Sequence, residues 1–331
     1  MSLHREQVDV KSLPHHYDGQ VSLAIIGGTG LYHLPNLKPI ARLTISTPWG
    51  FPSGPITIAE TENKFPVAFV ARHGPHHDLL PSDVPSRANI AALKSLGVKA
   101  IIAFSAVGSL QPEIKPRDFV LPTQIIDRTK GIRPSTFFEK GFVAHAMFGE
   151  PFDLQLNQII QDSIPTTGFL EGEIGLEPTF HTKAKTNNDE DLTIICMEGP
   201  QFSTRAESKL YRSWGGSVIN MSVLPEAKLA REAEIAYQMI CMSTDYDSWN
   251  EDEEPVTVET VVGNLKANSA NAVKLATKLI DVLEVEFNKN NGFAESLKGS
   301  MKFSVSTSPA AVDKSLLEKM HFLLPGYWPV N

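Results

Sequence analysis

The sequence is poor in cysteine and has no hydrophobic run long enough to cross a membrane. It has two cysteines among 331 residues, Cys196 and Cys241, both inside apolar, strand-like runs. We therefore expect both to be buried and reduced, as in a cytosolic protein, with a disulfide or a metal pair as the alternative. The apolar stretches KAIIAFSAVG and IAYQMICM are far shorter than the ~20 residues of a membrane span. The sequence thus argues against a disulfide-rich secreted domain and against a transmembrane protein.

Positive charge is also scarce. The chain has 30 Lys and Arg against 38 Asp and Glu, a net charge of -8, and no long run of basic residues. Because nucleic acids and acidic membrane surfaces bind basic protein surfaces, we expect neither as a partner. The N-terminal MSLHREQVDVKSLPHH has no apolar core, so we expect no secretion signal and a cytoplasmic location.

Apolar, β-branched runs alternate with segments of helical period, which predicts an α/β fold. We find no linker and no internal repeat, and therefore expect one domain over 21–290, an N-terminal arm over 1–20 and a C-terminal extension over 291–331. KAKTNNDED is expected to be a surface loop and SVSTSPAAVDK an irregular tail. Strands are expected over 21–28, 56–60, 66–71, 98–110, 192–199, 217–222 and 235–245, and helices over 86–97, 153–163, 203–214, 225–233 and 257–287.

The first predicted strand ends in GGTG, which resembles part of a dinucleotide-binding turn. His33 stands where the third glycine of that motif belongs, and Pro35 and Pro39 prevent the helix that such a site requires. A P-loop is excluded because no lysine followed by Ser or Thr comes after these glycines. What remains is a turn whose N–H groups and Thr29 hydroxyl could bind one anion, with a plain tight turn as the alternative.

Several other predicted strands also end in polar side chains. The ends of strands in an α/β sheet gather at one edge, where ligands usually bind. Together these side chains would supply hydroxyls, a guanidinium and an imidazole, the donors that suit a phosphate dianion. Each of them taken alone also fits a salt bridge, a cap or a turn. The set comprises Thr29, Arg72, His73, Ser105 and Ser222.

RHGPHHD raises a metal hypothesis, because His73, His76 and His77 are close in sequence. Gly74 and Pro75 exclude a helix that would place two histidines on one face, and we find no partner cluster of carboxylates or thiolates. No metal site is therefore expected.

STDYDSW places Asp245 and Asp247 two residues apart at the end of an apolar strand. In extended geometry both would point to the same side. A carboxyl in an apolar pocket has a raised pKa and can donate a proton to a leaving group, and a paired-carboxylate glycosidase is a second version of this hypothesis. The alternative is a turn that leads into the solvated NEDEE. MEGPQFSTRAES predicts only a loop and a helix that begins at Ser203 or Thr204.

Six motifs together resemble the trimeric purine nucleoside phosphorylase superfamily, most closely its 5′-methylthioadenosine phosphorylase branch, over about residues 21 to 285. The motifs are IIGGTG, ARHG, SAVGSL, MEGPQFSTRAES, VINMS with PE, and STDYDSW. The resemblance implies a single-domain nucleoside phosphorylase fold, a central mixed and twisted sheet, partly barrel-like, flanked by helices. It implies phosphorolysis of methylthioadenosine to adenine and 5-methylthioribose 1-phosphate in purine and methionine salvage. It further implies no cofactor beyond phosphate as co-substrate, a homotrimer with active sites near subunit interfaces, and a location in the cytoplasm with the nucleus as a second compartment.

The resemblance also implies roles for individual residues. Phosphate would be bound by Thr29, Arg72, His73, Ser105, the Ala106 N–H and Ser222, while His77 is a weaker candidate. Met221 would contact the ribose, Phe202 would line the nucleoside pocket, and the catalytic Asp245 and Asp247 would face the purine. The methylthio group would lie near Val258, Val261 and Val262 and near His145 of a neighbouring subunit, with Ser203 and Val258 contributing to specificity.

Asp245 decides between the branches of this superfamily. A protonated carboxyl can donate to N7 of a 6-aminopurine and accept from its N6, whereas the asparagine of the purine nucleoside phosphorylase branch suits a 6-oxopurine. We therefore expect adenine to be preferred, with an enzyme acting on inosine or guanosine as the first alternative. An oxidoreductase that uses a nucleotide cofactor and a non-catalytic nucleoside-binding protein are the alternatives from other classes.

Overall fold

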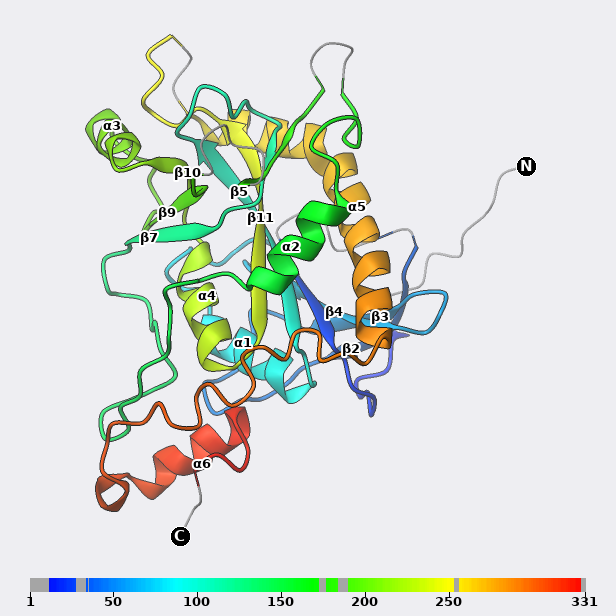
Figure 1. Cartoon of the computed structure of the whole chain (residues 1–331), viewed down its shortest axis with the longest axis vertical. Helices are drawn as coiled ribbons and strands as arrows, with labels where there is room; N and C mark the ends of the chain where they lie inside the picture. Colours follow the sequence, from blue (N-terminus) through cyan, green and yellow to red (C-terminus); the bar gives the residue numbers. More distant parts are fainter. Residues whose placement is uncertain are drawn as a thin grey trace.

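The computed structural model describes residues 12–27, 34, 36–172, 177–183, 190–252 and 256–328. Within this part of the chain one mixed β-sheet is flanked by helices, as predicted (Figure 1). The strands are β1 (Leu23–Gly27), β2 (Lys38–Leu43), β3 (Ile56–Glu60), β4 (Pro66–Ala71), β5 (Ala100–Ser109), β6 (Phe119–Val120), β7 (Gln124–Arg128), β8 (Phe180–His181), β9 (Thr193–Met197), β10 (Gly216–Asn220) and β11 (Ala236–Asp245). The helices are α1 (Ser86–Ser95), α2 (Leu154–Ser163), α3 (Arg205–Ser213), α4 (Val223–Glu232), α5 (Val258–Asn288) and α6 (Lys314–Leu323), with a 3-10 turn over Pro309–Ala311.

The sheet branches at its central strand, β5. The main order is β2-β3-β4-β1-β5-β10-β9-β7, and β11 pairs with both β5 and β6, which in turn pairs with β8. β5 runs parallel to β1 and β11 and antiparallel to β10. In the described part of the chain β2 and β7 remain at the two ends of this order, so the sheet is mixed but does not close into a barrel.

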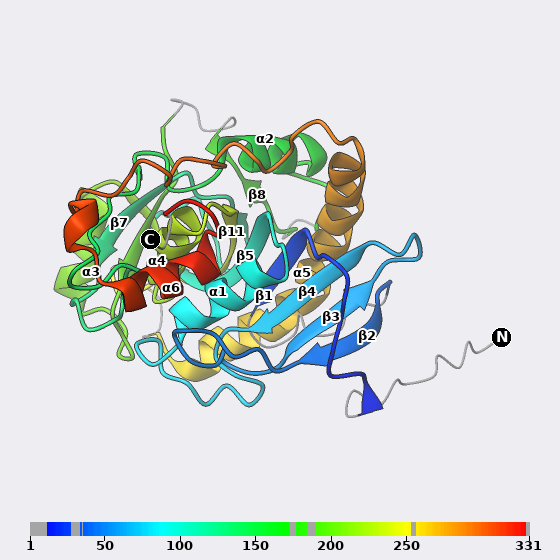
Figure 2. The same ribbon diagram turned by 90° about the horizontal axis from the view of Figure 1, so that it is seen from below.

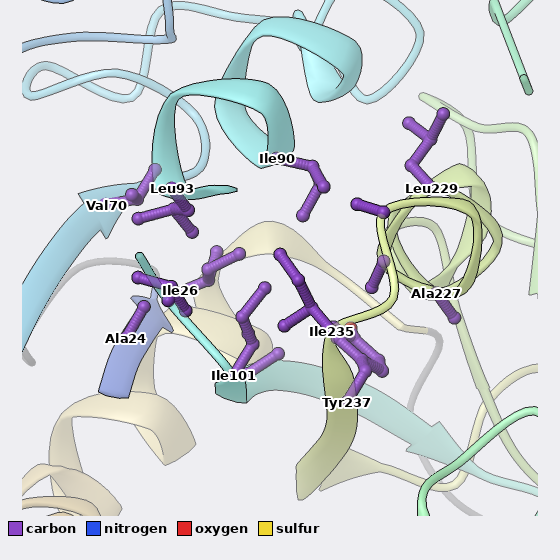
Figure 3. Packing of buried hydrophobic residues seen from close by; sticks show 14 of the residues in the cluster. Ala24, Ile26, Val70, Ile90, Leu93, Ile101, Ala227, Leu229, Ile235 and Tyr237 are labelled. Atoms are coloured by element: carbon purple, nitrogen blue, oxygen red, sulfur yellow. The ribbon is translucent and has the colours of Figure 1, made fainter. Parts of the chain in front are cut away.

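The two faces of the sheet are covered by different helices (Figure 2). Successive residues of β5 alternate between them: Ile101 packs with α1, α4 and α6, and Ile102 packs with α2 and α5. Figure 3 shows the first of these clusters, in which Ile90 and Leu93 of α1 lie close to the strand residues. This alternation follows from the two-residue period of a strand and produces a buried layer on each side.

Local capping explains where several helices begin. Thr204 and Glu207 form a capping box at the start of α3, and the Thr257 hydroxyl accepts from the Thr260 N–H at the start of α5. The predicted helix start at Ser203 or Thr204 is therefore confirmed, with Thr204 as the N-cap.

The sequence did not predict the strands β2, β6, β7 and β8 or the helix α6. β2 contains Pro39, which argues against a strand, but β2 ends the sheet order and its register shifts between Pro39 and Ala41. An edge position and a bulge both tolerate a residue that cannot donate to the ladder. α6 follows the predicted tail and buries Leu316, Met320 and Leu323 in the same cluster as α1.

The structure can be compared with two expectations from the sequence, those for the cysteines and for membrane-spanning segments. Cys196 and Cys241 are both buried and unbridged, and burial raises the pKa of the Cys196 thiol to about 12. The prediction of buried, reduced cysteines is confirmed. Within the described ranges, every helix is too short or too polar to serve as a membrane span.

Candidate functional site

The site lies at an opening on one edge of β5. β11 occupies the other edge of this strand from Ala100 to Gly108. β1 pairs only as far as Ala103, and β10 joins only at Gly108 and Ser109. Residues 104–107 therefore lie between two neighbouring strands that diverge, at the carboxyl ends of the parallel strands, where α/β folds commonly bind ligands.

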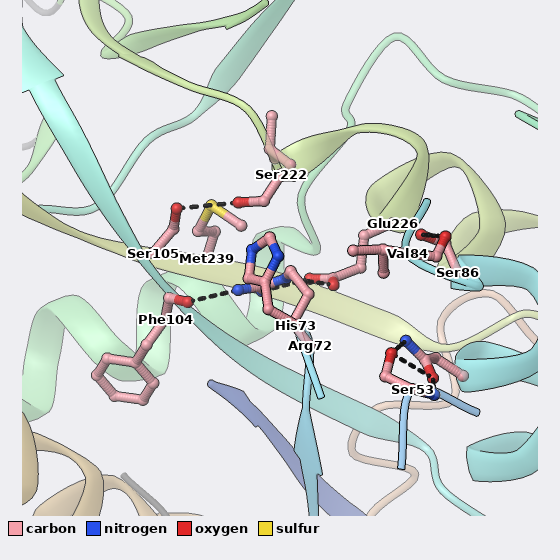
Figure 4. A network of polar contacts seen from close by, with 12 residues as sticks. Ser53, Arg72, His73, Val84, Ser86, Phe104, Ser105, Ser222, Glu226 and Met239 are labelled. Atoms are coloured by element: carbon pink, nitrogen blue, oxygen red, sulfur yellow. Dashed lines mark hydrogen bonds and ion pairs between the residues drawn. The ribbon is translucent and has the colours of Figure 1, made fainter. Parts of the chain in front are cut away.

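Arg72, directly after β4, points into this opening. It is 3% exposed; its Nε and Nη2 donate to the two carboxylate oxygens of Glu226 at 2.8 and 2.9 Å, and Nη1 donates to the Phe104 carbonyl at 2.9 Å (Figure 4). Tyr237 also donates to Glu226 at 2.7 Å. The guanidinium is thus held rigidly beside β5, and a buried carboxylate from α4 balances its charge.

His73 lies next to Arg72 and is neutral at physiological pH. Burial and the adjacent Arg72 charge lower the pKa of His73 to about 4. Its Nδ1 is 3.0 Å from the Leu79 carbonyl, which can only accept, so Nδ1 carries the single proton of the neutral ring. The ring of His77 packs at 4.7 Å from that of His73. His73 therefore presents an acceptor, Nε2, where the sequence predicted a donor.

Ser105 and Ser222 meet across the opening, although they are far apart in the sequence. Their hydroxyl oxygens are 3.0 Å apart (Figure 4). The Asn220 side-chain amide donates to both at 3.1 Å. Ala106 follows Ser105 on β5 and is partly exposed. Arg72, His73, Met221 and Ser222 line one pocket. Four of the predicted phosphate-site residues are thus adjacent, while Thr29 lies outside the described residues.

Asp245 and Asp247 lie together at the other end of the opening, over Gly108. A Cβ on Gly108 would stand 3.0 Å from Asp245 Oδ1 and 3.2 Å from Asp247 Cβ, so the lack of a side chain there leaves room for both. The predicted extended geometry is wrong: Asp247 has φ 49° and lies in a turn, and its N–H donates to Asp245 Oδ1 at 2.8 Å. The turn folds the Asp247 backbone onto the Asp245 carboxyl, whereas a continued strand would have carried Asp247 away from it.

Burial raises the pKa of both carboxyls. Asp245 is 8% exposed, and desolvation raises its pKa despite hydrogen bonds from the Thr244 hydroxyl and the Asp247 N–H, which favour the charged form. Desolvation, together with the charge of Asp245, raises the pKa of Asp247 to about 6. Two carboxyls with raised pKa values are better suited to proton transfer than ordinary, fully ionised ones.

Replacing Asp247 by Asn should stabilise the fold at high pH. The pKa is about 6 in the folded state against an ordinary 3.8, so the folded chain binds more protons between these values and loses stability as pH rises through that window. Asn cannot ionise and tolerates a positive φ. We expect Asp247→Asn to raise the free energy of unfolding by about 3 kcal/mol at pH 8 and not at all below about pH 4. Urea unfolding at both pH values measures this, and an equal gain at both would contradict the shift.

Of the predicted nucleoside-pocket residues, Ser203 is tied to the turn that holds these carboxyls. Ser203 is buried, and its carbonyl accepts from the Ser248 hydroxyl at 2.7 Å, one residue after Asp247. A Cβ on Gly199 would stand 2.3 Å from Met221 Sδ, so the segment that leads to the exposed Phe202 lies directly against Met221.

The predicted methylthio-site residues do not all come together in one chain. Val258 and Val262, in the first turns of α5, are 68% and 54% exposed, and Val261 is partly exposed. His145 is exposed on a separate loop, where its N–H donates to the Ser304 carbonyl. Figure 1 places that loop beside α6, at the opposite end of the molecule from the start of α5. A contribution of His145 to this site therefore requires another copy of the chain.

Four residues that shape the site were missed from the sequence: Asn220, Glu226, Arg133 and Glu198. Asn220 and Glu226 stand in the quoted VINMS and PE stretches, and Glu198 stands in MEGPQ, but nothing in the sequence indicates which side chains they pair with. Arg133 is 6% exposed and pairs with the buried Glu198. The metal hypothesis for RHGPHHD finds no support, since no three His, Cys, Asp or Glu side chains come together as a possible metal site in the part of the chain that is described.

Comparisons with known proteins identify the family of the chain. The family model of the phosphorylase superfamily matches residues 22–281. The S-methyl-5′-thioadenosine phosphorylase of Candida albicans (strain SC5314) is 80% identical over 332 residues, covering 100% of this chain and 95% of the relative. That of Yarrowia lipolytica is 63% identical, covering 96% of each.

Solved structures give the same result. A methylthioadenosine phosphorylase from an antarctic soil metagenomic library has a TM-score of 0.80 and 37% identity, covering 93% of this chain and 100% of the other. The methylthioadenosine phosphorylase of Schistosoma mansoni in complex with adenine has a TM-score of 0.75 and 30% identity, covering 87% and 99%. The chain therefore belongs to the phosphorylase superfamily and, within it, to the S-methyl-5′-thioadenosine phosphorylases.

Proposed function

We propose that the enzyme cleaves 5′-methylthioadenosine with inorganic phosphate, giving adenine and 5-methylthioribose 1-phosphate for purine and methionine salvage. Family membership supports the reaction. The observation that carries the proposal is the pair of buried carboxyls at one end of the β5 opening, with a guanidinium, an imidazole and two hydroxyls at the other. This arrangement provides an acid for the leaving base and an anion site for the attacking group.

The anion site would hold the phosphate through Arg72, His73, Ser105, Ser222 and the Ala106 N–H, together with Thr29, which follows β1 in the sequence. A bound dianion favours the charged form of a neighbouring imidazole and raises its pKa. Phosphate would thereby restore to His73 the second N–H that burial removes in the unliganded enzyme. Each serine hydroxyl can donate one hydrogen bond and can rotate to the anion, Ser105 from the Ala106 carbonyl at 2.9 Å and Ser222 from the Ser105 hydroxyl.

In the reaction, a phosphate oxygen forms a bond to C1′ while the C1′–N9 bond breaks and its electron pair moves to the purine. The ribose gains positive charge, which the adjacent dianion stabilises. The purine gains negative charge, which a proton from Asp245 at N7 neutralises. Asp247, whose N–H holds Asp245 Oδ1, would fix the orientation of that carboxyl and face the base as well. No cofactor is needed in this scheme.

The same carboxyl would set the choice of base. The protonated Asp245 carboxyl donates a hydrogen bond to N7 and accepts one from the N6 amino group. A 6-oxopurine has no such amino group at this position. Ser203, next to the Asp247 turn, and Val258, on the exposed first turn of α5, would contribute to substrate choice. We further propose that Val258, Val261 and Val262 form the apolar wall for the methylthio group. His145 of a neighbouring subunit would complete that wall in a homotrimer located in the cytoplasm and the nucleus.

Substrate comparison tests this proposal. We expect kcat/KM for methylthioadenosine to exceed that for inosine and guanosine by about 10⁴-fold, because a site built for one hydrogen-bonding pattern rejects the other. Initial rates with each nucleoside at saturating phosphate measure the ratio. Comparable rates with inosine would instead favour a purine nucleoside phosphorylase.

A further inference from the structure

Arg133 is a buried cation that the proposed reaction does not use. It is 6% exposed and stands on the loop after β7. Its Nε donates to Glu198, and the Glu198 carboxylate also accepts from the Lys130 N–H at 2.6 Å. Burial of an arginine is unfavourable unless its charge is paired and its donors are used.

The remaining donors of Arg133 all go to backbone carbonyls of the site. Nη1 donates to Met221 at 2.6 Å and to Leu224 at 2.7 Å, and Nη2 donates to Met197 at 3.3 Å and to Glu198. Met197 ends β9, Met221 follows β10, and Leu224 lies in the first turn of α4. One side chain thus ties together two segments that are distant in the sequence.

Ser222 lies between the two carbonyls that Nη1 holds. The same pocket is lined by Arg133, Met221, Ser222 and Leu224, together with Arg72. Carbonyl oxygens carry partial negative charge and would repel a bound anion. Anion binding in this pocket is therefore favoured when the carbonyl oxygens point to a hydrogen-bond donor instead of to the anion. The guanidinium both aims these carbonyls and restricts the backbone that places the Ser222 hydroxyl 3.0 Å from Ser105.

We infer that Arg133 is a positioning residue for phosphate, acting through the backbone around Ser222 without touching the ligand. The inference rests on the proposed function only in taking inorganic phosphate as the ligand of this pocket. Glu198 balances the charge of Arg133. Arg133 is therefore not an unpaired cation that would compete with Arg72 for the anion.

Binding of inorganic phosphate to the purified full chain, measured by calorimetry, tests the inference. We expect Arg133→Met to weaken phosphate binding by about tenfold or more, as loss of charge-assisted hydrogen bonds does. Arg133→Lys keeps the charge but has one donor group in place of the fork, so it should show a smaller loss. With methylthioadenosine, KM for phosphate should rise more than kcat falls.

Arg133→Met also leaves Glu198 buried and unpaired, so a second variant guards against misfolding. Arg133→Met/Glu198→Gln removes both charges and should recover the melting temperature while phosphate binding stays weak. Arg231→Met, on the last turn of α4, is the matched control: it removes a partly buried arginine that donates to the Glu150 carbonyl, and should leave phosphate binding unchanged.

Folded Arg133 variants that bind phosphate within twofold of the wild type would overturn the inference while leaving the proposed function intact. Weakened phosphate binding in a protein whose wild type does not cleave methylthioadenosine would overturn the proposed function and support the positioning role. Absence of phosphate binding in the wild type would overturn both.

Discussion

Asp245→Asn is expected to lower kcat/KM for methylthioadenosine by about 10² to 10⁴-fold, the usual contribution of a general acid. The amide can still donate to N7, but it cannot transfer a proton, and its donor opposes the N6 amino group. The relative rate with inosine should rise, because an amide suits N7 and O6 together. The fold should be retained, since Asn preserves the volume and removes a carboxyl whose pKa burial raises.

Steady-state kinetics with both nucleosides, together with thermal unfolding, measure this effect. Asp162→Asn on the exposed face of α2 is the matched control and should leave both unchanged. Near wild-type activity of a folded Asp245→Asn protein would show that Asp245 does not supply the proton. Asp247, with a pKa of about 6, would then be the next candidate.

Arg72→Met is expected to abolish phosphate use and to destabilise the protein. Loss of a preorganised donor to an anionic group costs about 10² to 10³-fold in rate. Glu226, with 3% side-chain exposure, would also lose its bidentate partner, and breaking a buried ion pair costs about 3 to 5 kcal/mol. Urea unfolding and the rate at saturating methylthioadenosine measure the two losses separately.

The double variant Arg72→Met/Glu226→Gln separates structure from catalysis. Removing both charges should recover most of the stability but none of the activity, since Gln still accepts from Tyr237. Arg87→Met, which breaks the partly exposed pair with Glu139 at 3.4 Å, should cost at most about 1 kcal/mol. Recovery of activity in the double variant would mean that Arg72 serves only the fold.

Some parts of the site could be predicted from the sequence, because their residues follow apolar strands or are neighbours in the chain. Arg72 follows β4 directly, and strand ends meet at one edge of an α/β sheet, so its place at the site could be predicted. Ser105 was also expected at a strand end but lies inside β5, where β1 no longer pairs with that strand. Asp245 and Asp247 are neighbours in the sequence, and their apolar strand indicated burial. Their geometry could not be predicted, because the left-handed turn at Asp247 depends on the fit of both carboxyls over Gly108.

The carboxylates that pair with the buried arginines of the site could not be predicted from the sequence. Glu226 lies 154 residues from Arg72, and Arg133 lies 65 residues from Glu198. Arg133 stands alone in a loop with no motif, so its burial becomes visible only when β9 and β10 are placed side by side. Pairings at such separations are decided by tertiary packing, which local propensity and spacing do not encode.

The phosphate requirement of adenine release tests the central claim most directly. The protein is incubated with methylthioadenosine with and without inorganic phosphate, and adenine and the sugar product are quantified over time. We predict release only with phosphate, with one 5-methylthioribose 1-phosphate formed for each adenine. Adenine release without phosphate, accompanied by free 5-methylthioribose, would show hydrolysis and contradict the proposed phosphorolysis.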